Sequence, residues 1–152
     1  MLRVVLATVP VLLAVAPGYT AQAQSVSAAP AKTAKSATTF ISDMLARGPA
    51  EVKPWPGFVR LSAVTAVSFK QSCQMVLALN DKSSHLVDLS RALSIRPSFS
   101  TNGPQSYVEI TGGMTAFRGV DIYVGDNASV RRVGEALEFL RASCDKNSAT
   151  GF

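Results

Sequence analysis

Apolar and polar residues alternate with a period of two along the middle of the chain, a pattern typical of half-buried β-strands. The alternation runs from Val59 to Phe69 and again from Cys73 to Leu79. Stretches rich in Gly, Asn, Ser and Pro separate the apolar runs, as expected of turns between short strands. Further strands are predicted over residues 85–90, 94–99, 107–111, 114–118 and 120–124.

Helical periodicity flanks the predicted strands on both sides. Before them, a short apolar face repeats at helical spacing, with Thr39 placed to cap the helix and Gly48 and Pro49 placed to end it. This face comprises Phe40, Ile41, Met44 and Leu45. After the strands, steps of three and four residues define one apolar stripe on an amphipathic helix. The stripe comprises Val130, Val133, Leu137, Leu140 and Cys144.

This order of elements predicts an α+β fold that is mostly β. We expect a small bent antiparallel sheet or partly open barrel of about six to seven strands, closed by the C-terminal amphipathic helix. The short N-terminal helix should dock on the same body because it is too short to be stable alone. The order is similar to that of pleckstrin-homology-like domains. That architecture serves lipid, peptide and purely structural roles, so it implies no single function.

The N-terminus has the three-part build of a secretory signal peptide. Arg3 precedes an apolar run over residues 4–16, and Ala21-Gln22-Ala23 supplies a cleavage site after Ala23. A membrane anchor is the alternative, but a span needs roughly 20 apolar residues. We therefore expect residues 1–23 to be a signal peptide, 24–37 a flexible leader, 38–147 one globular domain and 148–152 a C-terminal tail. The expected location is the bacterial periplasm or the outside of the cell.

Charge and composition limit the partners. The chain of 152 residues carries a net charge of +5, from 15 Lys and Arg against 10 Asp and Glu. The basic residues form no block, and the charges of the C-terminal helix nearly cancel, so no nucleic-acid partner and no stable membrane span are expected. A mild positive excess favours anionic envelope polymers or lipid headgroups.

Candidate catalytic and metal-binding residues are few. His85 is the one histidine of the chain, and Asp88 three positions later should point to the opposite side of the predicted strand. No nucleophile motif accompanies them, so we expect no enzyme. The alternative is a small hydrolase with dispersed catalytic residues around His85. Two cysteines and one histidine lack the spacing of a metal site, and neither a metal nor a cofactor is expected. Gly112-Gly113 fits a hairpin turn better than a phosphate loop.

The two cysteines are expected to form a disulfide bond. Cys73 shares a strand face with Met75 and Leu77, and Cys144 lies on the helical stripe with Leu140. Docking the stripe on that face brings the two sulfur atoms together in an oxidising compartment. The alternative is a pair of buried free thiols.

Three side chains are candidate partner contacts. Trp55 lies in the segment KPWPGF (Lys53–Phe58), predicted to be irregular because prolines flank the ring. Such a ring can contact a peptide, a sugar or a protein, or it can cover one end of the barrel. Phe139 lies nearly opposite the helical stripe, so either the short N-terminal helix covers it or it joins Arg132 in binding a partner protein or a second copy.

These observations favour a non-enzymatic exported binding or accessory domain. It would act through contacts with a protein partner or another envelope component, with the leader as a tether.

Overall fold

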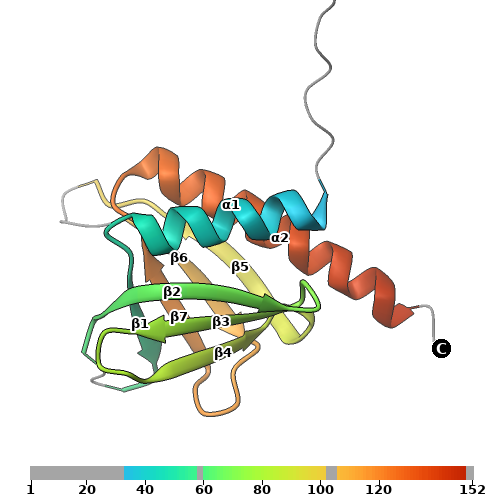
Figure 1. Ribbon diagram of the computed structural model, residues 1–152, viewed down its shortest axis with the longest axis horizontal. Coiled ribbons are helices and arrows are strands. Elements are labelled where there is room, and N and C mark those ends of the chain that lie inside the picture. Colours follow the sequence, from blue (N-terminus) through green and yellow to red (C-terminus); the bar gives the residue numbers. More distant parts are fainter. Residues whose placement is uncertain (1–32, 58–59, 102–105, 150–152) are drawn as a thin grey trace, which may run out of the picture. The chain divides into compact units, whose positions relative to one another are not determined.

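The computed structural model describes residues 33–57, 60–101 and 106–149 (Figure 1). Within these residues the fold is one seven-stranded antiparallel sheet, a helix before it and a helix after it. The helices are α1 (Ala34–Arg47) and α2 (Asn127–Ala149). The strands are β1 (Glu51–Trp55), β2 (Ser62–Lys70), β3 (Gln74–Leu79), β4 (Ser84–Asp88), β5 (Ala92–Ser98), β6 (Tyr107–Gly112) and β7 (Gly119–Tyr123). Their order across the sheet is β4-β3-β2-β1-β7-β6-β5, so the mostly-β class with two terminal helices is confirmed.

Both helices pack on the same apolar face of the sheet. Helix α1 lies against β2 and α2, and α2 lies against β5, β6 and the short 3-10 helix η1 (Leu89–Arg91) (Figure 1). A single core of buried apolar side chains joins α1, α2 and the sheet. Its largest fully buried members include Ile41, Leu45, Met75, Leu77, Leu89, Ile110, Ile122, Leu137 and Leu140.

The apolar stripe of α2 faces this core as predicted. Its members Val130, Val133, Leu137 and Leu140 are fully buried, and Cys144 is 3 % exposed. Gly134 lies beside the stripe, where a Cβ atom would stand 3.6 Å from Cβ of Pro97 on β5. The small residue therefore lies where the helix comes close to the edge of the sheet.

The predicted disulfide bond is confirmed. Cys73 and Cys144 are joined, with their Cα atoms 5.7 Å apart. Cys73 is in the turn just before β3, and its carbonyl accepts a hydrogen bond from the N–H of Leu89 at 2.8 Å. The bond thus fixes the C-terminal half of α2 to the β2–β3 turn.

Helix α1 begins earlier than predicted. The predicted cap, Thr39, lies inside the helix, and Thr33 occupies the N-cap position. The Thr33 hydroxyl accepts from the N–H of Ser36 at 3.0 Å, and the Ser36 hydroxyl accepts from the N–H of Thr33 at 3.0 Å. This reciprocal capping starts the helix at Ala34, so the end of the predicted leader belongs to it. The signal-peptide segment, the leader up to residue 32 and residues 150–152 of the predicted tail lie outside the described residues.

The prediction of an irregular segment at Lys53–Phe58 was wrong for its first three residues. Strand β1 pairs with β7 from Glu51↔Tyr123 to Trp55↔Gly119. Its pairing with β2 covers two positions only, Glu51 and Val52. Pro54 therefore lies where β1 has a neighbour on one side, the situation in which a strand tolerates proline.

Three further strand predictions were wrong in part or in whole. Residues 114–118 form part of the connection between β6 and β7 and are not a strand. Contacts with the end of β4 hold this connection in place. The Gly113 carbonyl accepts a hydrogen bond from the N–H of Asp88 at 2.7 Å, and Phe117 packs edge-on against His85. Gly112 and Gly113 begin this connection, both with positive φ. In β2, a bulge between Val64 and Ala66 changes which alternate residues face the core. Val64 is buried, whereas the predicted alternation placed its neighbours Ala63 and Thr65 on the buried face. The predicted strand 85–90 ends at Asp88, whose carboxylate caps η1.

Candidate binding face

The side of the sheet opposite the helices carries three rows of side chains across β5, β6, β7 and β1. The register places directly opposed residues on the same face, so each row can be read from the strand pairs. The tyrosine row is Ser98, Tyr107, Tyr123 and Glu51. The middle row is Arg96, Glu109, Asp121 and Lys53. The tryptophan row is Ser94, Thr111, Gly119 and Trp55. We call these three rows together the outer face.

The outer face follows from the sequence of its strands. In β1, β6 and β7, residues that alternate with those of the outer face are buried in the core, as Val52, Val108, Ile110, Val120 and Ile122 are. The outward positions hold charged, hydroxyl and aromatic side chains, most of them half-buried by one another. The fold therefore gathers three aromatic rings and five charged groups that are far apart in the sequence.

Trp55 is held in place by two features of the neighbouring strand β7. Its indole N–H donates to the Asp121 carboxylate at 3.1 Å. Its ring also lies over Gly119, where a Cβ atom would come within 2.4 Å of the ring. The glycine is thus required by the close approach of the indole. Trp55 is half-buried and fixed within its own sheet, and its predicted role as a partner contact stays a prediction.

The middle row places two carboxylates side by side between two cations. Glu109 and Asp121 are directly opposed on β6 and β7, with Arg96 next to Glu109 and Lys53 next to Asp121. Within the described part of the chain, no ion pair joins Arg96 to Glu109 or Lys53 to Asp121. Directly opposed like charges destabilise a sheet, so this arrangement is not explained by sheet stability.

Burial and charge alter two groups of the outer face. Burial raises the pKa of the Asp121 carboxyl, the hydrogen bond from Trp55 opposes this, and the charge of Glu109 adds to the rise. Burial also raises the pKa of the Tyr123 hydroxyl, with smaller contributions from Asp121 and Tyr107. The rings of Tyr107 and Tyr123 form a tilted pair with centroids 5.1 Å apart. The two rings and the carboxylates therefore form one interacting group.

His85 lies on β4 beside an aromatic ring. Its ring packs edge-on against Phe117, with centroids 5.5 Å apart. The Asp88 carboxylate accepts instead from the N–H and hydroxyl of Ser90, at 3.1 and 2.6 Å. Among the described residues, no hydrogen bond joins His85 to a carboxylate or a hydroxyl group, and the alternative of catalysis around His85 stays a prediction.

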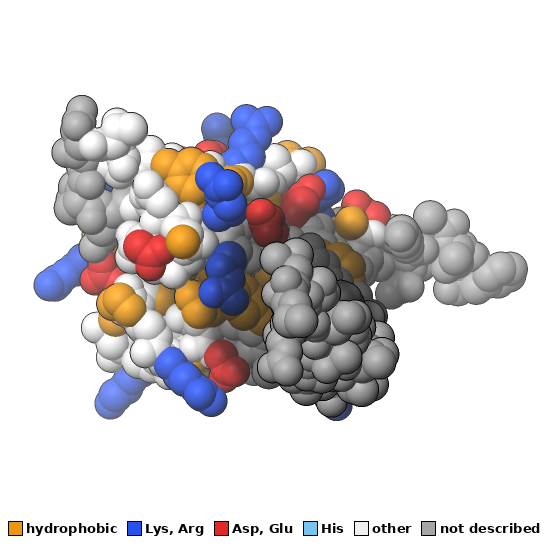
Figure 2. All heavy atoms as spheres, turned by 90° about the horizontal axis from the view of Figure 1, so that it is seen from above, with side chains coloured by type: hydrophobic (Ala, Val, Ile, Leu, Met, Phe, Trp, Pro, Cys, Tyr) orange, Lys and Arg blue, Asp and Glu red, His pale blue; other side chains and the backbone are white. Residues whose placement is uncertain are grey.

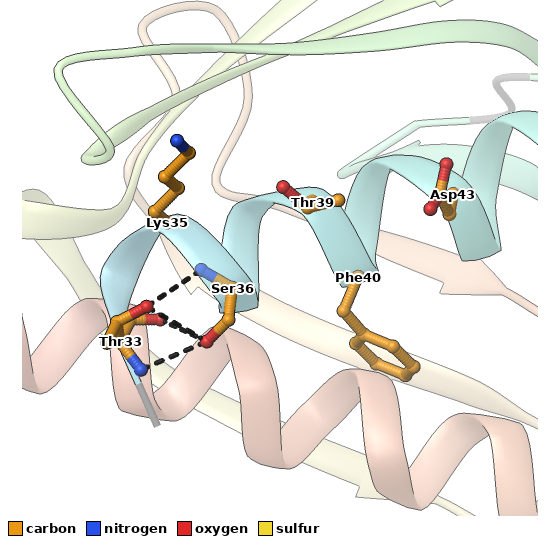
Figure 3. Close-up of a pocket in the computed structure, with 6 residues that line it drawn as sticks. All are labelled: Thr33, Lys35, Ser36, Thr39, Phe40 and Asp43. Atoms are coloured by element: carbon orange, nitrogen blue, oxygen red, sulfur yellow. Dashed lines mark hydrogen bonds between the residues drawn. The ribbon is translucent and has the colours of Figure 1, made fainter. Parts of the chain in front are cut away.

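A hollow on α1 is a weaker candidate. Thr33, Lys35, Ser36, Thr39, Phe40 and Asp43 line it (Figure 3). Its hydroxyl groups at Thr33 and Ser36 are used in capping the helix, and Asp43 pairs with Arg47 at 3.1 Å. Phe40 points toward α2, where the Arg132 guanidinium lies over its ring at 5.0 Å (Figure 3). Most of the polar groups of the hollow thus serve the helix itself.

Arg132 lies where α1 meets α2, over the ring of Phe40. Phe139 is partly buried and packs against the core, and its helix lies against α1. These observations favour burial of Phe139 by the short helix α1 over burial by a partner. The role of Phe139 and Arg132 as partner contacts stays a prediction. Seen from above the view of Figure 1, apolar side chains on this side are interrupted by charged ones and form no continuous patch in the part that is not grey (Figure 2).

Sequence reasoning did not find Tyr107, Tyr123, Glu109, Asp121, Lys53 or Arg96. The available signal was the alternation inside YVEIT and GVDIY, where aromatic and acidic residues occupy every second position. That signal gives no site until the register is known, because β1 and β7 are neighbours in the sheet but more than 60 residues apart in the chain.

Comparisons with protein families, curated proteins and solved structures find no match. Within residues 33–57, 60–101 and 106–149, no group of three His, Cys, Asp or Glu side chains is placed to hold a metal ion. No helix in the same ranges is long and apolar enough to cross a membrane.

Proposed function

We propose that this protein is a non-enzymatic, exported binding domain and that the outer face is its binding surface. The observation that carries the proposal is the outer face itself: three aromatic rings and five charged side chains share one side of four adjacent strands, while both described helices pack on the other side. The bound molecule is an envelope component or a partner protein.

The rigidity of the outer face supports a binding role. Its side chains stand on strands and not on loops, and Trp55 is fixed by Asp121 and by Gly119. A preorganised surface loses little conformational entropy when a ligand binds. The unfavourable Glu109 and Asp121 pair points the same way, because a protein keeps such a cost where function requires it.

Export to the periplasm or the cell exterior is part of the proposal. The Cys73–Cys144 bond is compatible with an oxidising compartment, and the N-terminal residues match a signal peptide in sequence. The partly open barrel and the pleckstrin-homology-like order of elements also remain predictions, and they assign no ligand.

The alternative of a hydrolase around His85 has less support, since Phe117 is the neighbour of that ring and Asp88 caps η1. The proposal predicts no bond cleavage in the molecule that binds.

Capture on the immobilised, oxidised full chain tests the binding surface. An envelope fraction is passed over the wild type, the double variant Tyr107→Ser/Tyr123→Ser and the control variant Leu93→Ser. Leu93 is 78 % exposed and lies on β5 outside the three rows, so its loss should leave capture unchanged. The double variant should lose the captured component. Equal capture by all three proteins would show that the outer face is not the binding surface.

A further inference from the structure

The distribution of charge and aromatic rings on the outer face distinguishes between classes of ligand. Four of the five charged side chains form the middle row, Glu51 stands at one end of the tyrosine row, and the aromatic rings stand in the rows on both sides of the middle row. The middle row spans about 14 Å across four strands, and about 13 Å separates the tyrosine row from the tryptophan row along the strands. The face thus has a polar centre and aromatic borders.

This arrangement is the reverse of a protein-binding surface. The centre of a protein interface is depleted of charged residues, and its polar residues form the rim. A protein partner would have to desolvate Glu109 and Asp121 at the centre, where an imperfectly paired buried charge costs affinity. The most exposed large apolar side chains, Leu93, Leu86 and Phe99, lie outside the three rows.

A second copy of the chain is also disfavoured. The charges of the middle row read plus, minus, minus, plus from Arg96 to Lys53. This order is the same from both ends, so two outer faces centred on each other would place like charge against like charge in either direction. Repulsion of this kind excludes wrong partners at charged surfaces.

The net charge of the row disfavours polyions. The two cations and two anions of the middle row sum to zero, and Glu51 in the tyrosine row adds one negative charge, so the outer face offers no excess positive potential to a nucleic acid or an anionic polymer. The matching ligand is uncharged, rich in hydroxyl groups and apolar on its flat sides.

We infer that the outer face binds a neutral carbohydrate chain, an inference that rests on the proposed function and names the class of its ligand. The C–H faces of sugar rings stack on Tyr107, Tyr123 and Trp55. Between the aromatic borders, the carboxylates of Glu109 and Asp121 accept hydrogen bonds from sugar hydroxyls, and Arg96 and Lys53 donate hydrogen bonds to sugar oxygens. Because the borders are far apart, the site takes several linked rings and a monosaccharide cannot reach both.

Trp55 provides the measurement, because it is the one tryptophan of the chain. The oxidised full chain is titrated with neutral hexasaccharides of β-1,4-linked glucose and β-1,4-linked N-acetylglucosamine, and the indole fluorescence is recorded. At least one hexasaccharide should produce a saturable change, while its monosaccharide binds at least tenfold more weakly. No change with either hexasaccharide at millimolar concentration overturns the carbohydrate inference.

Variants locate the site. Tyr107→Ser should weaken binding about tenfold through loss of a stacking partner, and Glu109→Gln should weaken it while leaving the fold unchanged. Leu86→Ser is the matched control, because Leu86 is 41 % exposed on β4, outside the three rows. Equal affinity of Tyr107→Ser and Leu86→Ser would show that the hexasaccharide does not bind at the outer face and would overturn the carbohydrate inference. The circular dichroism of each variant must match the wild type.

Two outcomes separate this inference from the proposed function. If both hexasaccharides fail but capture from the envelope still depends on Tyr107 and Tyr123, the binding surface stands and its ligand is not a neutral sugar. If a highly charged polymer or a protein changes the Trp55 fluorescence and the hexasaccharides do not, the binding surface again stands and the inferred class of ligand is wrong.

Discussion

At the scale of single residues, two glycines show how close packing decides the effect of one methyl group. A Cβ atom on Gly119 would stand 2.4 Å from the Ile110 carbonyl oxygen and 2.4 Å from the Trp55 ring, so Gly119→Ala should destabilise the protein by about 1–3 kcal/mol. A Cβ atom on Gly134 would meet Pro97 and Val108 at ordinary distances of 3.6 and 3.8 Å. Gly134→Ala should therefore stabilise α2 by about 0.5–1 kcal/mol. Urea unfolding measures both, and a stable Gly119→Ala variant would show that Trp55 does not lie over this glycine.

Asp121 makes stability depend on pH in a direction that the structure fixes. Burial raises the pKa of its carboxyl, so the folded protein holds the proton more tightly than the unfolded chain. The stability from this group is present below the unfolded pKa of about 4 and is lost as pH rises through the higher folded pKa. Asp121→Asn cannot titrate, and its amide oxygen can still accept from Trp55. The variant should therefore gain stability relative to wild type as pH rises above about 4.

Asp126 supplies a control of opposite sign for that experiment. Hydrogen bonds from the N–H and hydroxyl of Ser129 lower the pKa of the Asp126 carboxyl. Its stabilising effect is present above the unfolded pKa and is lost as pH falls, so Asp126→Asn should lose stability relative to wild type as pH rises. If both variants show the same sign in urea unfolding at each pH, Asp121 is not the source of the effect.

At the scale of elements, the disulfide bond is the strongest single link between α2 and the sheet. It joins residues 71 positions apart, and closing a loop of that length is worth about 4 kcal/mol in the chain-entropy model. Cys73→Ser/Cys144→Ser should lower the free energy of unfolding by about that amount, as measured in urea without reductant. Addition of reductant should lower the stability of the wild type and leave the double variant unchanged. Equal stability of the two oxidised proteins would contradict a structural role for the bond.

The elements that sequence could predict are those whose signal is local and continuous. The stripe of α2 was readable because its buried residues fall every three or four positions, and it placed Cys144 correctly opposite Cys73. Strand β1 was missed because Pro54 and Pro56 oppose regular structure locally, while pairing with β7 supplies the partner that permits it. The start of α1 was missed because Thr33 and Ser36 cap it without an apolar neighbour. The outer face depends on strand order, which no local pattern in the chain reveals.

At the scale of the whole molecule, the sheet has one narrow connection. Strands β1 and β2 pair at Glu51↔Ala63 and Val52↔Ser62 only, so β2, β3 and β4 could in principle open as a unit separate from β1, β7, β6 and β5. Three features oppose this. The core is continuous across the connection, and the disulfide bond ties the β2–β3 turn to α2. Helix α1 also packs on both β2 and α2 (Figure 1).

We therefore expect the described domain to unfold as one cooperative unit. The thermal midpoint from Trp55 fluorescence, which reports on β1 and β7, should coincide with the midpoint from far-ultraviolet circular dichroism. The amides of Leu77 in β3 and Ile110 in β6, both in fully buried residues, should exchange with solvent at the same free energy of opening. A markedly lower value for Leu77 would show that the β2–β4 part opens by itself. The same measurement on Cys73→Ser/Cys144→Ser then tests whether the disulfide bond is what couples the two parts, because its loss should lower the Leu77 value more than the Ile110 value.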